Sequence, residues 1–350
     1  MAGVMLPWSV MSCSPLAVPR LWLRIWLNPL CEDEVIRVLN PVLKIALTSP
    51  EAAKAPSLHI LPLAKARSAF SKLIRRLEAS IDLACEVEQG EMALEGRTLP
   101  WRLYRADTTS PTASTCMVFF HGGGWVIGDL DSHDNLCRAL CLHSGISLLS
   151  VDYRRAPEDP FPAAFHDARD AMVWAREHAA SLGFDPALMG AGGDSAGANI
   201  AAAAALALRD QGEQPGAFQM LIYPSVTAEG ETESYKAYGK GFGLDAAVMD
   251  WFADHYLPKG VDRTNPYVSP LLAESLAGFP PTVLVTAGFD PLRDAGEAFA
   301  ERLKAAGVRT EYREFPDLIH GFVAWAGLVP SAQAAIQETA ELLGAISADT

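Results

Sequence analysis

The sequence is short of positive charge. It carries 28 Lys and Arg residues against 42 Asp and Glu residues over 350 positions, which gives a formal net charge of −14 and a pI near 5.0. A nucleic-acid-binding protein needs a concentrated basic surface to neutralise phosphates, so this composition argues against that class. The charge is uneven, because residues 1–80 hold ten basic and five acidic side chains. The acidic excess therefore belongs to the rest of the chain.

The sequence also lacks the cysteine pattern of a disulfide-stapled or zinc-binding protein. Its six cysteines, at positions 13, 31, 85, 116, 137 and 141, have no framework spacing. Cys137, Cys141 and nearby His143 would supply metal ligands, but no second ligand pair follows at zinc-like spacing. We therefore expect reduced thiols, as in a cytoplasmic protein, and no metal, with Cys137 and Cys141 packed on a helix.

A clear signal peptide is missing as well. The first nineteen residues carry no charged side chain, but prolines interrupt them and no clean cleavage site follows, so we expect a cytoplasmic rather than an exported protein. Residues 20–28 contain two arginines and two tryptophans, each pair spaced four apart. This segment is too short to span a bilayer. It either lies on a membrane surface or packs on the protein body, and we favour packing.

Hydrophobic periodicity predicts an α/β protein. The length and a hydrophobic content of 50% are those of one large domain with or without an appendage. Helical patterns at 32–47 and 64–77 precede strands that alternate with helices, which indicates a mainly parallel sheet covered on both faces. The expected strands are 85–94, 98–105, 115–120, 146–152, 220–223, 282–286 and 308–315. The expected helices are 132–143, 163–182, 196–209, 293–306 and 330–346.

Residues 193–197 read Gly-Asp-Ser-Ala-Gly and join a short apolar run to an alanine-rich helix. This G-x-S-x-G pattern is that of a nucleophile elbow, in which small residues let the backbone turn sharply and expose a serine, here Ser195. Alone the pattern is weak, because serine is also a common helix N-cap beside a glycine turn. The interpretation depends on the other groups that a serine nucleophile needs.

A glycine run lies upstream of the elbow. Residues 121–125 read His-Gly-Gly-Gly-Trp and follow the expected strand 115–120. Glycines there let backbone N–H groups point into a cavity, which an oxyanion requires. In lipases and esterases such a loop acts together with the N–H of the residue after the nucleophile, which would be Ala196.

An acid and a base follow in the expected order. Asp290 comes shortly after the apolar run 282–286, and His320 lies in the loop after the strand 308–315. Because carboxyl ends of parallel strands meet at one edge of a sheet, these residues are candidates for the acid and the base of a Ser-Asp-His triad. Asp294 is the nearest rival for the acid, but it belongs to the next helix and more plausibly supports the loop.

Several ordered motifs carry a family resemblance. They lie at residues 121–125, 153–158, 161–164, 193–197, 290–294 and 320–322. The chain from about 39 to 345 resembles the bacterial hormone-sensitive-lipase-like carboxylesterases of the α/β-hydrolase superfamily.

The resemblance implies a catalytic domain over 83–350 and a helical cap built from residues 39–82 and an insertion at about 229–261. Residues 1–38 have no counterpart in the family and form an extension of unknown role. The implied activity is hydrolysis of short- to medium-chain acyl esters, a small-molecule substrate class, without a cofactor.

The same resemblance implies roles for individual residues. Ser195, Asp290 and His320 would form the triad, and the N–H groups of Gly123, Gly124 and Ala196 the oxyanion hole. Four aromatic residues are candidates for the substrate pocket: Trp125, Phe242, Trp251 and Phe252.

Two alternatives stay open. A hydrolase of the same kind could act at a membrane or lipid surface, through the tryptophans of residues 20–28. A protein of this fold could also bind a ligand without catalysis, although related plant receptors lose a triad residue and this chain keeps all three. The sequence does not indicate the natural ester or the oligomeric state.

Overall fold

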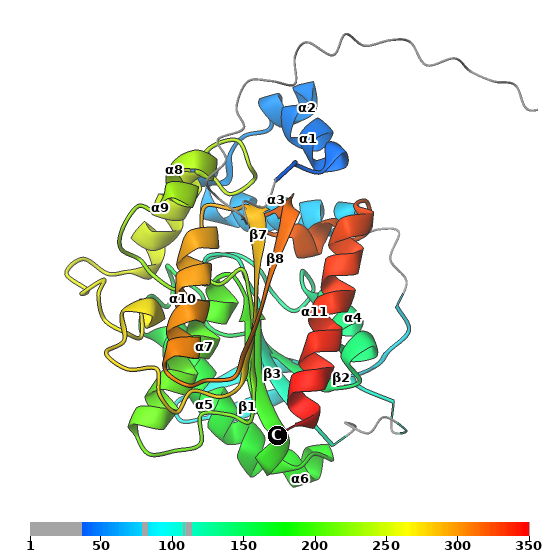
Figure 1. Ribbon diagram of the computed structural model, residues 1–350, viewed down its shortest axis with the longest axis vertical. Helices are drawn as coiled ribbons and strands as arrows, with labels where there is room; N and C mark the ends of the chain where they lie inside the picture. The colour runs from blue at the N-terminus through cyan, green and yellow to red at the C-terminus, as the bar shows by residue number, and fades with distance from the viewer. Residues whose placement is uncertain (1–36, 79–82, 108, 110–113, 350) are drawn as a thin grey trace, which may run out of the picture. The chain divides into compact units, whose positions relative to one another are not determined.

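An eight-stranded sheet runs through the described part of the chain (Figure 1). The computed structural model describes residues 37–78, 83–107, 109 and 114–349. The strand order is β1-β2-β4-β3-β5-β6-β7-β8. The strands are β1 (Glu86–Leu94), β2 (Arg97–Arg105), β3 (Cys116–Phe120), β4 (Ser147–Val151), β5 (Met189–Asp194), β6 (Gln219–Ile222), β7 (Thr282–Phe289) and β8 (Thr310–Ile319).

The sheet is mainly parallel, as predicted. β1 and β2 form the expected hairpin around Glu95 and Gly96, and β2 pairs antiparallel with β4. All other neighbouring strands are parallel. Phe120 at the end of β3 pairs with Gly193 in β5, so the glycine loop after β3 and the elbow after β5 leave the sheet at the same edge.

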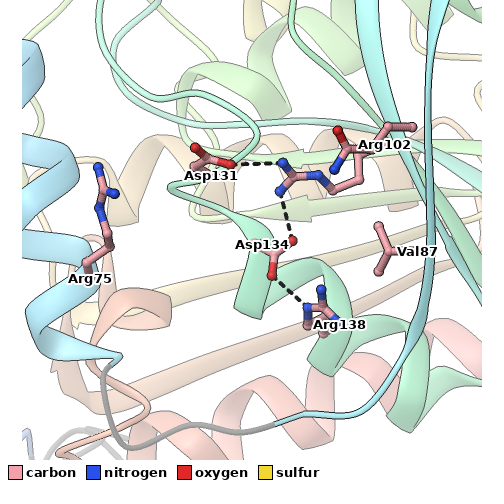
Figure 2. A pocket seen from close by; sticks show the side chains of 7 residues that line it. Arg75, Val87, Arg102, Asp131, Asp134 and Arg138 are labelled. Carbon is pink, nitrogen blue, oxygen red and sulfur yellow. Dashed lines mark hydrogen bonds and ion pairs between the residues drawn. The ribbon is translucent and has the colours of Figure 1, made fainter.

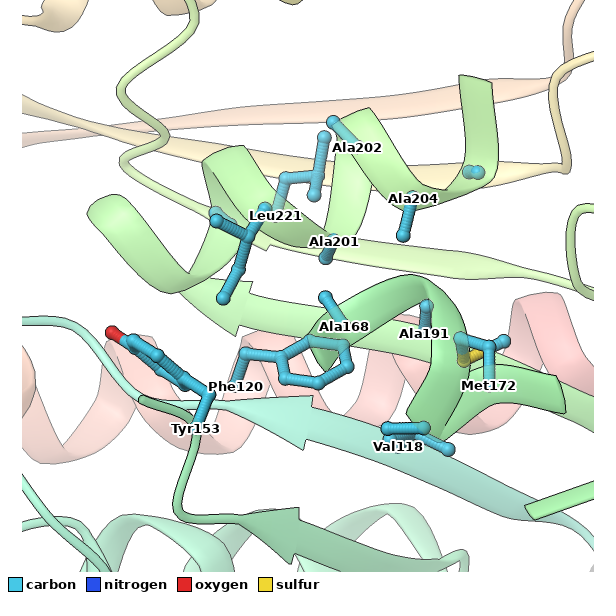
Figure 3. Close-up of a cluster of buried hydrophobic side chains, with 14 of the residues drawn as sticks. Val118, Phe120, Tyr153, Ala168, Met172, Ala191, Ala201, Ala202, Ala204 and Leu221 are labelled. Carbon is cyan, nitrogen blue, oxygen red and sulfur yellow. The ribbon is translucent and has the colours of Figure 1, made fainter. Parts of the chain in front are cut away.

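Helices cover both faces of this sheet (Figure 1). One face packs against α5 (Ala163–Glu177), α7 (Ala196–Asp210) and α10 (Arg293–Ala305), and the other against α4 (Asp134–Ser144) and α11 (Pro330–Ala348). The alternating side chains of β3 divide between the two cores, with Val118 and Phe120 on the first face and Met117 and Phe119 on the second. Figure 3 shows the first core, where the alanines of α7 let this helix approach the sheet closely.

Further helices complete the described part of the chain. Those at the end of the sheet toward which β7 and β8 point are α1 (Pro41–Thr48), α2 (Pro50–Lys54), α3 (Leu63–Leu77), α8 (Glu233–Tyr238) and α9 (Ala246–Tyr256) (Figure 1). The others are α6 (Ala179–Leu182) and the 3₁₀ turns η1 (Leu58–Ile60), η2 (Pro186–Leu188), η3 (Pro270–Leu272) and η4 (Phe322–Trp325). Arg67 of α3 donates to the carbonyl of Val126 at 2.8 Å, which ties α3 to the segment after the glycine loop.

The helix predicted over 32–47 is wrong at its start. The described residues 37–40 are not helical, and α1 begins only at Pro41. The Asn40 side chain caps the helix by accepting the N–H of Val42 at 3.0 Å, and proline is favoured at the first helical position. Residues 32–36 and the segment 20–28 lie outside the described residues.

Two further elements end four or more residues away from their predicted ends. The helix expected over 163–182 is two helices, because α5 ends before His178, whose ring stacks on Trp174 with centroids 4.1 Å apart. The strand expected over 308–315 continues to Ile319, because β8 resumes pairing after an irregularity and joins Ile319 to Phe289. His320 therefore follows the strand directly.

The cysteines of α4 have the environment expected for a packed helix, since Cys137 and Cys141 are both fully buried. Among the described residues, no group of three His, Cys, Asp or Glu side chains could hold a metal ion. Within the same residues, no helix is long and apolar enough to cross a bilayer.

Glu78 is a buried carboxyl between α3 and α4. It is 6% exposed and accepts a hydrogen bond from Asn135 Nδ2 at 3.2 Å. Burial raises the pKa of Glu78 to about 7, although Asn135 and His133 favour the charged form. Because the folded state holds this proton more tightly than the unfolded state, the free energy of unfolding falls as pH rises from about 4.5 through 7.

Glu78→Gln should therefore stabilise the protein at pH 8 by about 1–3 kcal/mol and leave its stability nearly unchanged at pH 5, since each pKa unit corresponds to about 1.4 kcal/mol. Urea unfolding of both proteins at the two pH values measures this difference. The exposed Glu341→Gln is the control and should show no pH-dependent gain. Equal stabilities of Glu78→Gln and the parent at pH 8 would contradict the assignment.

Candidate active site

Ser195 occupies the turn between β5 and α7. Its backbone has φ 53° and ψ −116°, a conformation that residues with a side chain rarely adopt. Close packing holds the turn: a Cβ on Gly193 or Gly197 would collide with the backbone of Phe120 at the end of β3. The sharp strand-to-helix turn predicted from the sequence is thus present, and its glycines are required by contact with a neighbouring strand.

His320 and Asp290 lie beside this serine. His320 Nε2 is 2.9 Å from Ser195 Oγ, and His320 Nδ1 is 2.8 Å from Asp290 Oδ2. Asp290 is fully buried, and its other carboxylate oxygen accepts the N–H of Leu292 at 2.7 Å. In this arrangement the imidazole can take the serine proton while the carboxylate fixes its tautomer and stabilises its positive form.

Asp294, the rival acid, has a different role in the fold. Its Oδ2 accepts the backbone N–H of Ser234 at 2.7 Å, which connects α10 to α8. Burial acts to raise the pKa of Asp294, but the Ser234 N–H and the Arg293 guanidinium outweigh it and hold that pKa below its ordinary value. Asp294 is therefore an anchor for the segment that contains α8.

Three backbone N–H groups near the serine are available to a ligand. Gly123 and Gly124 have φ values of 116° and 58°, which favour glycine. The N–H groups of Gly123, Gly124 and Ala196 make no hydrogen bond with the described residues. Unpaired donors of this kind can stabilise a negative charge that develops on a substrate oxygen.

A buried carboxylate fixes the glycine loop to the elbow. Asp194 directly precedes the nucleophile candidate and is 4% exposed. Its Oδ1 accepts the N–H of Gly122 at 2.7 Å and lies 3.2 Å from His133 Nε2, while the Tyr223 hydroxyl donates to Oδ2 at 3.3 Å. Asp194 therefore holds the loop after β3 against the turn after β5.

In the Asp194–His133 pair, each side chain favours the charged form of the other. Burial acts to raise the pKa of Asp194, but the charge and hydrogen bond of His133 outweigh it and lower that pKa. For His133, burial acts to lower the pKa, but the Asp194 carboxylate outweighs it and raises that pKa. Neither residue was assigned a role from the sequence. The only sequence signal for this contact is an acidic residue inside the G-x-S-x-G motif, and nothing in the sequence indicates its partner.

The four aromatic candidates have different positions. The Phe252 ring of α9 lies against Gly124, where any Cβ would collide with it, and Trp125 stacks on Tyr256 with ring centroids 4.4 Å apart. Phe242 stacks on Phe289, the residue before the candidate acid, at 5.7 Å. Trp251 packs on Phe252 and on His255. Phe252 is thus the candidate in direct contact with the glycine loop.

A hollow of about 370 Å³ lies between α3, the β1–β2 hairpin and α4, and no residue of the candidate site lines it (Figure 2). Four of its charged groups pair with one another, and Arg75 of α3 stands apart from them. Arg102 contacts Asp131 at 2.9 Å and Asp134 at 2.8 Å, and Arg138 contacts Asp134 at 2.6 Å. Since these ion pairs satisfy the carboxylates, the hollow is a structural charge network.

Comparison with known proteins agrees with this geometry. Residues 117–324 match the family model described as alpha/beta hydrolase fold. Carboxylic ester hydrolase LipN of Mycobacterium tuberculosis is 40% identical over 293 residues, which cover 81% of this chain and 77% of LipN. Ethyl acetate hydrolase of Pseudomonas putida is 34% identical over 312 residues, which cover 87% of this chain and 98% of that protein. In a solved structure of an ester hydrolase from the metagenome of Lake Arreo, the sequence is 40% identical to this chain. The match covers 88% of this chain and 99% of that chain, with a TM-score of 0.84.

Asp194→Asn should lower kcat for a p-nitrophenyl ester by about 10- to 100-fold with little change in KM, because a displaced loop misaligns donors that act mainly in the transition state. The control is Asp210→Asn, at the far end of the helix that follows the elbow, where the carboxylate pairs with Arg209 at the surface. This control should keep the parent kcat. A rise in KM alone for Asp194→Asn would contradict a positioning role.

Proposed function

The chain belongs to the hormone-sensitive-lipase-like carboxylesterases of the α/β-hydrolase superfamily and hydrolyses carboxylic esters, and from this premise we propose that Ser195, His320 and Asp290 perform the reaction. The observation that carries the proposal is the continuous chain of contacts from Ser195 Oγ through His320 to Asp290, at 2.9 Å and 2.8 Å. Ser195, Asp290 and His320 come from separate loops at one edge of the sheet. Local chain geometry alone would not bring them together, which supports a shared catalytic function.

The first half of the reaction forms an acyl-enzyme. Neutral His320 takes the proton of the Ser195 hydroxyl as the oxygen attacks the ester carbonyl, and Asp290 stabilises the imidazolium that results. The carbonyl oxygen becomes an oxyanion. When the intermediate collapses, His320 gives its proton to the leaving alcohol, and the acyl group stays on the serine.

The second half releases the acid. His320 removes a proton from water, which attacks the acyl-enzyme, and the serine recovers its proton when the acid leaves. We assign the oxyanion in both halves to the N–H groups of Gly123, Gly124 and Ala196. The loss of one such donor typically costs about 3 kcal/mol in the barrier, so the glycine loop contributes nearly as much as the nucleophile.

The substrate class is short- to medium-chain acyl esters. One relative, which aligns with this chain over 98% of its own length, is named an ethyl acetate hydrolase. This name supports the short end of the range of acyl chains. The Phe252 ring against Gly124 also supports it, because a bulky side chain stands next to the proposed oxyanion donors. We assign the cap to residues 39–82 with the insertion at about 229–261, since Phe252 belongs to that insertion.

Ser195→Ala should lower kcat/KM for p-nitrophenyl acetate by at least about 10³-fold and abolish covalent labelling by an organophosphate. His320→Ala should lower it by a similar factor, and the double variant should be no worse than either, because the residues act as a unit. The control is Ser225→Ala, a serine whose N–H donates to the Ser195 carbonyl at 3.2 Å, and it should keep the labelling. Labelling that persists in Ser195→Ala would identify a different nucleophile.

Phe252→Leu should shift the acyl-chain preference toward longer esters, because a smaller side chain leaves more room beside Gly124. Across p-nitrophenyl esters from acetate to palmitate, we expect the decanoate-to-acetate ratio of kcat/KM to rise by about 3- to 10-fold. Phe252→Ala should shift this ratio further if it folds, which its melting temperature reports. An unchanged ratio in Phe252→Leu, with acetate activity intact, would remove Phe252 from the pocket without affecting the triad.

A further inference from the structure

Two thiols meet where the chain enters the edge strand. Cys85 directly precedes β1 and is half-buried, and Cys141 lies on α4 and is fully buried. Their Sγ atoms are 3.8 Å apart, although 56 positions separate them in the sequence. A disulfide needs a sulfur separation of about 2.05 Å, so the atoms must approach by less than about 2 Å for a bond to form.

The surroundings make the two thiols unequal. Arg138 is held by Asp134 at 2.6 Å (Figure 2) and donates to the carbonyl of Cys85 at 3.2 Å. Hydrogen bonding between the thiols, helped by the Arg138 charge, lowers the pKa of Cys85 to about 7 against the effect of burial. The same hydrogen bond, together with burial, raises the pKa of Cys141. Cys85 is thus the more acidic thiol of the pair, and Cys141 the less acidic one.

The other described cysteines lack these features. Cys116 and Cys137 are fully buried. Burial raises the pKa of Cys116 to about 12 and also raises that of Cys137. Protonated, buried thiols react poorly with oxidants, because the thiolate is the nucleophile. They therefore serve as internal controls.

We propose that Cys85 and Cys141 form a peroxide-reactive dithiol site that closes to a disulfide between the edge strand and α4. A half-buried cysteine with a second thiol within contact distance is the arrangement that captures a sulfenic acid before it oxidises further. The site is independent of ester hydrolysis, because neither sulfur contacts the residues of the proposed triad or oxyanion hole.

The chemistry takes place in two steps. The Cys85 thiolate attacks a peroxide oxygen: an S–O bond forms, the O–O bond breaks, and hydroxide leaves with the electron pair, so the sulfur is oxidised to a sulfenic acid. The Cys141 sulfur then attacks the Cys85 sulfur. An S–S bond forms, the S–O bond breaks, and the hydroxyl group leaves with the Cys141 proton as water. Hydrogen peroxide is the oxidant in both the proposal and its test.

The test uses the full-length chain, reduced and then exposed to hydrogen peroxide. After alkylation and non-reducing digestion, mass spectrometry should find one cross-linked peptide pair that joins Cys85 to Cys141, with Cys116 and Cys137 alkylated only after denaturation. The oxidised protein should melt a few degrees higher than the reduced one, because the bond closes a long loop. Dithiothreitol should reverse both changes. Cys85 oxidised to sulfinic acid without a cross-link, or linked to Cys13 or Cys31, would overturn the proposal.

Variants separate the roles of the two thiols. Cys141→Ala should let dimedone trap the Cys85 sulfenic acid at least about 10-fold more than in the parent, because the resolving thiol is gone. Cys137→Ala makes the same change one turn earlier on α4 and should leave the cross-link intact. Ester hydrolysis reports that each variant is folded. Equal dimedone labelling in Cys141→Ala and the parent would show that Cys141 does not resolve the sulfenic acid.

Discussion

Close packing between the β5–α7 turn and the end of β3 is the constraint on which the rest of the site depends. Gly193 and Gly197 lie so near the Phe120 backbone that a side chain at either position would push the strand and the helix apart. This contact sets the strained backbone of Ser195 and also brings the glycine loop after β3 beside it. A single contact between neighbouring strands therefore aligns the serine with the available N–H donors.

Buried charges keep this arrangement rigid. Asp194 and Asp290 are almost completely removed from solvent, and burying a carboxylate is costly unless hydrogen bonds and an opposite charge compensate. Asp194 has the Gly122 N–H and the imidazole of His133, and Asp290 has a histidine and a backbone N–H. Asp194 fixes the glycine loop, and Asp290 orients His320, the proposed base. Such preorganised polar groups do not need to rearrange during the reaction.

The segments that approach the site from outside are anchored to the same loops. Phe252 of α9 touches Gly124, and Asp294 of α10 binds the start of α8 through Ser234. Under the proposed assignments, a change in the residues around 229–261 should therefore alter both the space for substrate and the support of the loops around the proposed triad. Substrate preference at such a site is therefore best measured with conservative substitutions, because these leave contacts such as Asp294 with Ser234 in place.

Most of the fold was predicted from periodicity, and the errors have local causes. The order and type of the strands follow from short apolar runs between helical patterns, because burial on both faces leaves that trace in the sequence. The helical pattern in the sequence extends across Asn40, but in the structure Asn40 caps α1, so this helix begins later than predicted. The pattern also extends across His178, where the predicted helix is broken and the His178 ring stacks on Trp174. The predicted end of β8 was too early. The strand continues because Ile319 pairs with Phe289 beyond an irregularity in the register, and hydrophobic periodicity does not indicate such pairing.

The sequence by itself determined the order of the site motifs and their places at strand ends. Ser195, Asp290 and His320 could be chosen because the carboxyl ends of parallel strands share one edge, which is a property of the fold class and not of exact coordinates. Only the tertiary structure decided that Asp194 binds the Gly122 N–H and His133, or that two cysteines 56 positions apart lie within 3.8 Å. The reason is physical: local periodicity reports which face of an element is buried, whereas the partner of a buried polar group depends on how separate elements pack.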